Sequence, residues 1–398
     1  MAQTVESAGE RIVLLDGART AIGSFGGALK DVPAHELGAT AIRGALARAG
    51  VAADQVDEVV MGCIGQVGPD AYVSRRAAVA AGLPVGVPAY TVNRLCGSGL
   101  QAIWSAAMQM RWGGVDIAVA GGNESMSRMP FYDFGARAGY RLGDRALVDG
   151  TVMMLTDPFE GIHMGVTAEN VAAAYGISRQ AQDEFAVESQ RRAATAEAQA
   201  AFAEEIVPVE IGGRKPVTVS TDEHPKPSTT LETLAGLRPA FAQDGTVTAG
   251  NASGINDGAG AVVLARESVA AERGLRGLVV LEAVATAALE PSMMGYAPVP
   301  ALRKLFAMTG TRPSDIGIVE LNEAFAAQAV ACLRDAELDP AQVNPYGGAI
   351  ALGHPVGATG ANLTLRVAKE MVRRDHELGI VTMCIGGGQA LAALFRRI

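Results

Sequence analysis

The sequence lacks the signals of membrane insertion and of export. It contains no run of about 18 apolar residues, so we expect no membrane-spanning helix and no membrane partner. The first residues, MAQTVESAGERIVLL, hold no basic stretch followed by an apolar core, and their two glutamates are unlike a transit peptide. These absences predict a cytoplasmic protein.

Signals of metal binding and of disulfide bonding are also missing. There are only five histidines, and neither C-x-x-C nor H-E-x-x-H occurs. The scattered cysteines are Cys63, Cys96, Cys332 and Cys384. This pattern disfavours a metal site or a disulfide framework and predicts reduced thiols.

The chain has too little positive charge for general nucleic-acid binding. Its net charge is −9, and no Gly-Lys pair is present, which excludes a P-loop for nucleotide phosphates. An anionic small molecule is still an allowed ligand, provided that basic residues gather locally.

Glycine, by contrast, is abundant. It supplies 48 of the 398 residues, above the usual ~7%, which indicates tight turns and close approach of the backbone to ligands or to other backbone. A hydrophobic fraction of 49% and a charged fraction of 19% are typical of a globular protein, here long enough for two or three cores.

Strand-like apolar runs alternate with helical patterns toward both ends of the chain. The expected strands are 12–15, 58–61, 89–92, 117–120 and 317–321, and the expected helices include 35–49 and 98–110. This alternation predicts α/β layers around a parallel or mixed sheet. Between 125 and 251 the pattern breaks, apart from helices expected at 166–175 and 178–201, which predicts an inserted loop domain.

A weak internal repeat divides the rest of the chain into two similar halves. Residues 54–62 and 314–322 each read as a polar turn followed by a buried strand, and each half continues with a glycine-rich turn and a strand that runs into glycines. The predicted domains are 1–124 together with 252–276, 125–251, and 277–398. Because sites in such sheets form at the carboxyl ends of strands, both glycine-rich turns should share one cleft.

Residues 96–99, CGSG, lie between an expected strand and an expected helix. A thiol there meets free backbone N–H groups and the helix dipole, which predicts a nucleophile with a pKa below the usual ~8.5. Gly97 and Gly99 would keep side chains away from a substrate and from the turn. Two other interpretations stay open. One is a buried structural cysteine, and the other is a dinucleotide fingerprint with Glu124 as the ribose-binding acid.

Three further segments carry polar groups on turns. His354 lies in GHPVGATG, where proline and glycines fix the chain, and is either a general base or a surface-loop histidine. Cys384 precedes three glycines, whose N–H groups suit an oxyanion, although a core cysteine also fits. Asn322 follows an expected strand and either orients a water or caps a helix.

Together these segments resemble the thiolase family. Five motifs carry the resemblance, in the family's order and over essentially the whole chain: NRLCGSG at 93–99, NASGINDG at 251–258, NEAFA at 322–326, GHPVGATG at 353–360 and CIGGG at 384–388. The resemblance implies the thiolase fold, an α/β protein whose two duplicated mixed-sheet halves form a layered α-β-α-β-α core with an inserted loop domain.

The resemblance also implies a mechanism without a cofactor. Cys96, activated by His354, would take an acyl group from one acyl-CoA, and Cys384 would remove the α-proton of acetyl-CoA. The enolate oxygen would face His354 and a water on Asn322. The acyl oxygen would face the N–H groups of Cys96 and Gly386.

By the same resemblance, coenzyme A would bind against the inserted domain. Arg214, Lys215, Lys226 and Arg238 are candidate partners for its phosphates, or members of a solvated charged loop. The residues expected to line the CoA channel and the acyl pocket are His163, Met164, Lys226, Ala249, Ser253, Met294, Ala324 and Phe325.

The pair His163-Met164 resembles short-chain, biosynthetic thiolases, which implies an acetyl-CoA C-acetyltransferase acting on acetyl-CoA, acetoacetyl-CoA and CoA. Arg94 is more typical of 3-ketoadipyl-CoA thiolases, and the bulky Tyr296 is expected to narrow or reshape the acyl pocket. A longer or dicarboxylic substrate is therefore the alternative. A non-catalytic CoA- or lipid-binding relative is an alternative of another class. The resemblance also implies a homotetramer, formed through an arm at 131–150.

Overall fold

The computed structural model describes residues 9–66 and 68–398. The sequence-based prediction that the first residues carry no targeting signal rests partly on residues 1–8, which lie outside the described residues. Within the described ranges, no helix is both long and apolar enough to cross a bilayer.

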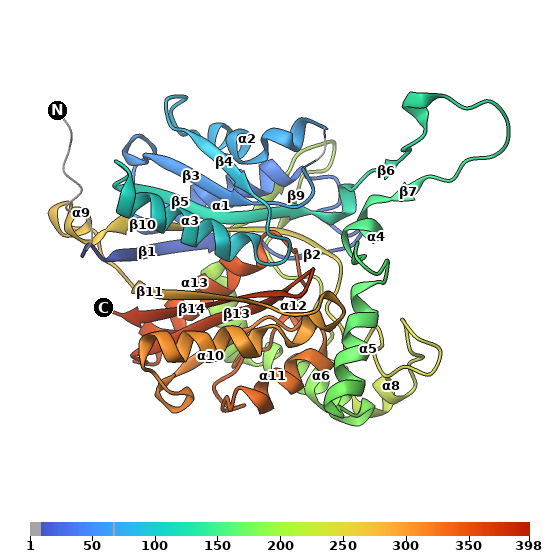
Figure 1. Ribbon diagram of the computed structural model, residues 1–398. Helices are drawn as coiled ribbons and strands as arrows, with labels where there is room; N and C mark the ends of the chain where they lie inside the picture. The colour runs from blue at the N-terminus through green and yellow to red at the C-terminus, as the bar shows by residue number, and fades with distance from the viewer. Residues whose placement is uncertain (1–8, 67) are drawn as a thin grey trace.

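The main strands form two arrays that repeat one topology (Figure 1). The first array, in sheet order, is β4 (Ala89–Val92), β3 (Glu58–Gly62), β5 (Ile117–Ser125), β10 (Asn256–Arg266) and β1 (Ile12–Arg19). The second array is β12 (Ile318–Leu321), β13 (Leu378–Ile385), β14 (Gln389–Arg397) and β11 (Val279–Ala288). Strands β3-β5-β10-β1 match β12-β13-β14-β11, because each series has a parallel pair followed by two antiparallel pairs.

The two arrays meet edge to edge between β1 and β11. A short antiparallel pairing of Val13 and Leu14 with β11 joins them into one 10-stranded sheet, and the short strand β2 (Gly23–Ser24) pairs with β10. Both β1 and β11 also carry a register shift, after Leu14 and after Leu281 respectively. Shared irregularities of this kind support the internal repeat inferred from the sequence.

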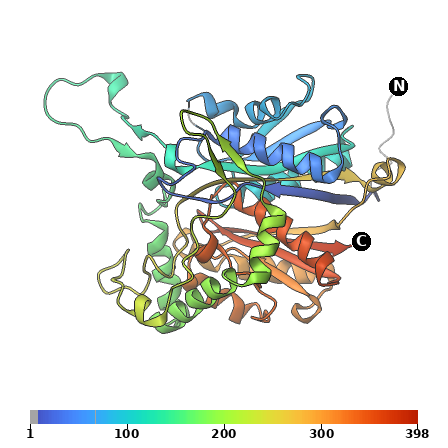
Figure 2. The same ribbon diagram turned by 180° about the vertical axis from the view of Figure 1, so that it is seen from behind.

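Helices fill the space between the arrays and cover their outer faces (Figures 1 and 2). The central helices α3 (Ser98–Trp112) and α13 (Thr359–Arg373) share one apolar core with strands of both arrays. The other helices of the two halves are α1 (Ala34–Ala49), α2 (Val73–Ala80), α9 (Glu267–Glu272), α10 (Pro298–Thr309), α11 (Ala326–Asp335) and α12 (Ala349–Leu352). Helix α1 ends at Gly50, which adopts the left-handed conformation with a φ of 66°. The predicted α-β-α-β-α layering is confirmed.

The segment between β5 and β10 contains more regular structure than the sequence predicted. Its helices are α4 (Gly150–Met154), α5 (Met164–Tyr175), α6 (Arg179–Ala193), α7 (Ala196–Glu205) and α8 (Leu231–Ala235). Its strand pairs are β6 (Phe131–Tyr132) with β7 (Val148–Asp149), and β8 (Val209–Ile211) with β9 (Val217–Val219). The β6–β7 arm extends away from the body of the molecule (Figure 1).

The prediction of a single long helix at 178–201 is wrong, because the segment forms two helices, α6 and α7. Ser178 caps α6 by accepting the N–H of Ala181. The hydroxyl of Thr195 then accepts the N–H of Ala198, so a second cap ends the first helix and starts α7.

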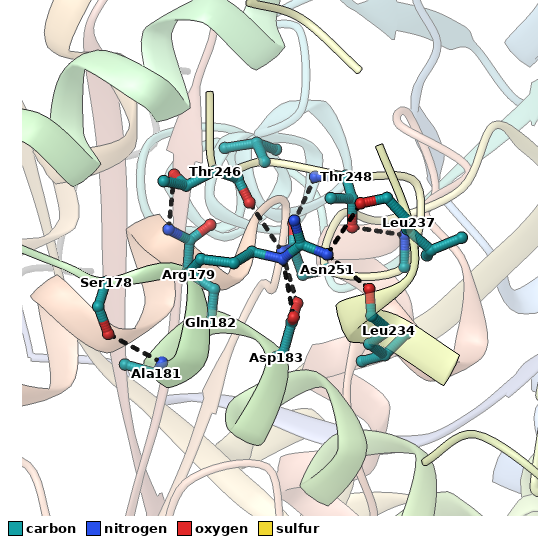
Figure 3. Close-up of polar contacts among 12 residues, drawn as sticks. Ser178, Arg179, Ala181, Gln182, Asp183, Leu234, Leu237, Thr246, Thr248 and Asn251 are labelled. Atoms are coloured by element: carbon teal, nitrogen blue, oxygen red, sulfur yellow. Dashed lines mark hydrogen bonds and ion pairs between the residues drawn. The ribbon is translucent and has the colours of Figure 1, made fainter. Parts of the chain in front are cut away.

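A polar network fixes the end of the inserted segment onto α6 (Figure 3). Arg179 bonds the Asp183 carboxylate at 2.7 Å and the Leu234 carbonyl at 2.5 Å. Asn251, the first residue of NASGINDG, donates its amide to Asp183 at 2.9 Å and to the Thr246 carbonyl at 3.1 Å. The network therefore sets where the chain enters β10.

Candidate active site

A strained turn presents Cys96 between β4 and α3. Leu95 adopts a φ of 46°, which is uncommon for any residue other than glycine. The hydroxyl of Ser98 supports the turn, since it accepts the N–H of Arg94 at 2.8 Å and donates to the Leu95 carbonyl at 2.7 Å. The half-buried Cys96 thiol is thus held at the amino end of α3.

The glycines of CGSG make room for protein rather than for substrate, which corrects the sequence-based interpretation. A Cβ at Gly97 would collide with the side chain of Ile385, and a Cβ at Gly99 would lie 2.9 Å from the carbonyl oxygen of Gly357. The turn therefore packs between the end of β13 and the GHPVGATG turn. The two glycine-rich turns come together as the repeat predicted.

His354 lies between α12 and α13 and is only 5% exposed, which excludes a surface-loop histidine. Its backbone N–H donates to Asn256 Oδ1 at 2.9 Å. The ring places Nδ1 2.7 Å from Thr359 Oγ1 and Nε2 3.4 Å from Asn322 Nδ2. Burial lowers the pKa of His354 to about 4, so the imidazole is neutral near pH 7 and can accept a proton.

The partners of His354 indicate which ring nitrogen carries the proton. Thr359 Oγ1 donates its proton to the Pro355 carbonyl at 3.0 Å, so it can accept from Nδ1–H. The Asn322 amide group donates toward Nε2. We therefore assign the proton to Nδ1 and the free lone pair to Nε2.

The Cys96 thiol is not activated by the helix alone, and the predicted lowering of its pKa is wrong. Burial raises the pKa of Cys96 to about 11, although its own N–H and the N–H of Gly386 bond the sulfur and partly offset this effect. A base is therefore needed to form the thiolate. The same two N–H groups are the donors predicted for the acyl oxyanion.

Cys384 and Asn322 lie at the ends of two neighbouring strands. Cys384 is fully buried near the end of β13, and burial together with the nearby Cys96 and Cys332 raises its pKa well above the ordinary value. Asn322 follows β12 and does not cap α11, which begins at Ala326. Its buried Oδ1 has no hydrogen-bond partner among the described residues, so the amide is available for a further contact.

A cavity of about 230 Å³ opens beside Cys96. Of the predicted site residues, Cys96, Met164 and Gly386 line it. Three more lining residues, Leu95, Val356 and Gly387, belong to the motifs but were given no role in the pocket. The lining residues outside the motifs are Ile64, Met153, Met154, Leu155, Thr156 and Pro158. Most are ordinary apolar residues without a motif, so no sequence signal marked them. A larger groove of about 630 Å³ between α6 and α11 contains none of the predicted site residues.

The remaining predicted acyl-pocket residues gather around Cys384. Met294, Ala324 and Phe325 share a buried cluster with Cys384, against which Met164 packs. His163 caps α5 and stacks on Phe241 at 4.8 Å, and Phe241 meets Phe325 edge-on at 6.1 Å. These contacts connect the His163-Met164 pair to the cluster.

The predicted CoA-channel residues lie farther out. Ser253 donates its N–H to the Ala324 carbonyl at 3.0 Å, which places it next to the cluster around Cys384. Ala249 and Lys226 are exposed, and the backbone of Lys226 bonds Gln190. The other basic candidates, Arg214, Lys215 and Arg238, are exposed as well.

Tyr296 does not line the cavity beside Cys96 and packs instead against the cluster around Cys384, so its effect on the acyl pocket stays a prediction. Its ring stacks on Tyr175 at 3.9 Å, and its hydroxyl donates to Asp335 at 2.8 Å. Arg94 is likewise engaged within the protein, because it bonds Gln101 on α3 at 2.6 Å.

Glu124 does not bind a ribose. It is fully buried, and its carboxylate accepts the N–H groups of Ile64, Gly65 and Gly357. An acid engaged in this way is unavailable to a nucleotide, so the dinucleotide interpretation of CGSG is excluded.

Known proteins resemble the chain over its full length. Residues 12–268 match the N-terminal domain of thiolases, and residues 275–397 match the C-terminal domain. The chain is 52% identical to the beta-ketothiolase BktB and 48% identical to an acetyl-CoA acetyltransferase, both of Cupriavidus necator. Each match covers 97% of this chain and 99% of the relative.

Solved structures share the fold. The acetyl-CoA acetyltransferase of Bacillus anthracis matches with a TM-score of 0.96 at 43% identity, over 98% of this chain and 99% of that one. A human mitochondrial 3-ketoacyl-CoA thiolase in complex with CoA matches with a TM-score of 0.94 at 38% identity, over 98% of both chains. The chain therefore belongs to the thiolase family of acyltransferases.

Proposed function

We propose that the protein is an acetyl-CoA C-acetyltransferase that converts two acetyl-CoA reversibly to acetoacetyl-CoA and CoA through an acyl-Cys96 intermediate. One observation carries the proposal: the Cys96 sulfur lies against two backbone N–H groups at the wall of an apolar cavity. Neutral His354 and the buried Cys384 supply the proton transfers that such a reaction needs.

The first step forms the acyl-enzyme. Nε2 of His354 takes the thiol proton while Cys96 Sγ attacks the thioester carbonyl, and the leaving CoA sulfur receives that proton. The N–H groups of Cys96 and Gly386 stabilise the charge on the carbonyl oxygen. One thioester replaces another, so the step is readily reversible.

The second step forms the carbon–carbon bond. Nε2 of His354 takes the thiol proton of Cys384, and the Cys384 thiolate removes the α-proton of a second acetyl-CoA. The resulting carbon attacks the carbonyl of acetyl-Cys96. The Nε2–H of protonated His354 and a water bound to Asn322 stabilise the enolate oxygen. The Nε2 proton of His354 then passes to the Cys96 sulfur as acetoacetyl-CoA leaves, while Cys384 keeps the α-proton, so Cys96, His354 and Cys384 all return to their starting states.

CoA would extend from this site toward the inserted segment 125–251, past His163, Ser253, Ala249 and Lys226. A homotetramer formed through the β6–β7 arm also belongs to the proposal. The arm and the chain around it expose large apolar side chains, which favours an intersubunit contact. These residues are Phe131, Phe134, Tyr140, Leu142 and Leu147. A cytoplasmic location stays a prediction.

The acyl preference is the finer part of the proposal. The cavity of about 230 Å³ and its methionine-rich wall support a short chain over a longer or dicarboxylic one. We expect kcat/KM for thiolysis of acetoacetyl-CoA to exceed that for 3-ketoadipyl-CoA by at least about tenfold. The Cys96→Ser variant is the control and should lose both activities. A preference for 3-ketoadipyl-CoA would identify the alternative substrate class, and full activity of the control would favour a non-catalytic role for Cys96.

A further inference from the structure

Glu124 is a buried acid that the mechanism above does not use. It lies near the end of β5 and is 0% exposed. Its Oε2 accepts the N–H of Ile64 at 3.0 Å and that of Gly357 at 3.1 Å. Its Oε1 accepts the N–H of Gly65 at 2.8 Å and lies 3.6 Å from Cys63 Sγ. Three backbone N–H groups and one thiol therefore surround the carboxylate, which indicates that Glu124 holds backbone segments in place and does more than fill the core.

The donors come from segments that are far apart in the sequence. Ile64 and Gly65 follow β3 in the first array, whereas Gly357 belongs to the GHPVGATG turn that carries His354. Ile64 and Val356, the residue before Gly357, both line the cavity beside Cys96. One carboxylate therefore connects two walls of the candidate active site.

The contact is made with backbone, and it is tight. A Cβ at Gly357 would lie 2.6 Å from Glu124 Oε2, and a Cβ at Gly65 would lie 2.8 Å from Oε1. Gly357 in turn touches the start of α3, since a Cβ at Gly99 would lie 2.9 Å from the Gly357 carbonyl. A displacement of the carboxylate would thus move the turns of both His354 and Cys96.

Two side chains from outside the His354 turn accept backbone N–H groups of the turn. Asn256 on β10 holds the N–H of His354 at its start, and Glu124 on β5 holds the N–H of Gly357 three positions later. Without Glu124 the N–H of Gly357 would lose this acceptor, and of the two side-chain acceptors only Asn256, at the start of the turn, would be left. Reaction rates depend steeply on such placement, since a shift of about 1 Å can cost on the order of a hundredfold.

We propose that Glu124 is a positioning residue for acyl transfer, which holds the His354 turn against the wall formed by Ile64 and Gly65. It acts through the backbone and does not touch the reacting atoms. The inference rests on the proposed function, because it assigns Glu124 to the Cys96–His354 chemistry.

Two variants distinguish the hydrogen bonds that the Glu124 side chain accepts from its negative charge. Glu124→Ala removes every bond to the two turns. Glu124→Gln keeps one carbonyl oxygen, which in the Oε2 position still accepts from Ile64 and Gly357 while the amide nitrogen faces the Gly65 N–H. Ser125→Ala is the matched control, because Ser125 is the next residue on β5, is buried and bonds the Val32 carbonyl instead.

The test measures single-turnover acetylation of Cys96 by acetyl-CoA, the KM for acetyl-CoA and the melting temperature of each variant. For Glu124→Ala we expect acetylation slower by about a hundredfold, with KM within about threefold of wild type. Glu124→Gln should restore the rate to within about tenfold, and Ser125→Ala should match wild type. Assays are run well below each melting temperature, so that loss of fold is not read as loss of rate.

Three results would overturn the positioning role: a wild-type rate for Glu124→Ala, a rate for Glu124→Gln as low as that of Glu124→Ala, or an equal loss in Ser125→Ala. A wild-type protein that forms no acetyl-Cys96 at all would instead overturn the proposed function, and the role of Glu124 with it.

Discussion

At the scale of single residues, the hydroxyl of Thr359 accepts a hydrogen bond from Nδ1 of His354 and so leaves Nε2 as the proposed base. Thr359→Val removes the acceptor for Nδ1–H, so the proton can move to Nε2 and block it. We expect kcat to fall by about 10- to 100-fold with little change in KM, whereas Thr359→Ser keeps most of the activity.

The control for this prediction is Thr364→Val. Thr364 lies on the same helix, is equally buried and bonds the Gly360 carbonyl at 2.7 Å. If Thr364→Val loses as much activity as Thr359→Val, the effect comes from packing of α13 rather than from the imidazole.

The sequence was informative about which residues gather at the candidate site and less so about their protonation and burial. Motifs identified Cys96, His354, Asn322 and Cys384, and the structure places them at the ends of matching turns and strands. The pKa of Cys96 was predicted in the wrong direction, because desolvation outweighs the helix dipole and no motif reports burial. The apolar cavity wall was missed for the same reason.

At the scale of elements, the network around Asn251 holds the predicted CoA-channel loop on α6. Asn251→Ala leaves the buried Asp183 with fewer donors, so we expect a loss of about 1–3 kcal/mol in unfolding free energy. KM for acetyl-CoA should also rise, because Ala249 and Ser253 lie in the loop. Denaturant unfolding and steady-state kinetics check the two effects.

The matched control is Gln180→Ala on the exposed side of α6, where the Gln180 amide bonds Glu184. This variant should change stability by less than about 0.5 kcal/mol. An Asn251→Ala protein as stable as the control would contradict the role given to the network.

Element prediction succeeded where hydrophobic periodicity was strong and failed where side chains cap the backbone. The expected strand 89–92 agrees with β4, and the expected helix 35–49 differs from α1 by one residue. The break between α6 and α7 was missed because helical periodicity continues across Thr195, and only its side-chain bond marks the new start.

At the scale of the whole molecule, a buried ionic cluster joins both strand arrays to α7, which lies alongside them (Figure 2). Arg19 on β1 pairs with Glu205 at 2.7 Å and with Asp222 at 2.8 Å, and Arg366 on α13 pairs with Glu205 at 3.0 Å. Two guanidinium groups are thus neutralised by two carboxylates. Glu320 on β12 is a third carboxyl group, and its oxygens have no hydrogen-bond partner among the described residues.

Burial raises the pKa of Glu320 to about 8, so near pH 7 the folded protein holds a proton that the unfolded chain releases. The contribution of Glu320 to the unfolding free energy is fully present below its unfolded-state pKa of about 4.5. This contribution is lost as the pH rises toward 8. Glu320→Gln stays neutral. We expect the unfolding free energy of the variant minus that of wild type to increase by roughly 3 kcal/mol from about pH 5 to about pH 8. Urea unfolding at the two pH values measures this difference. A stability difference that is the same at both pH values would contradict this account.

The duplicated architecture could be predicted from the sequence, whereas the junction between the halves could not. Matching motifs revealed the repeat, but Glu124, Glu205 and Glu320 act through partners far away in the chain. Their roles depend on which distant segments the fold brings together, and local sequence patterns do not indicate such long-range contacts.

The central claim is that Cys96 carries the acyl group, and trapping that group tests it most directly. In Cys384→Ala the α-proton of the second acetyl-CoA has no base, so the first step should proceed and the second should stop. After mixing with acetyl-CoA, acid quench and digestion, mass spectrometry should find about one acetyl group per chain on the Cys96 peptide. An unmodified Cys96 peptide, or acetylation of Cys63 or Cys332 instead, would contradict the account.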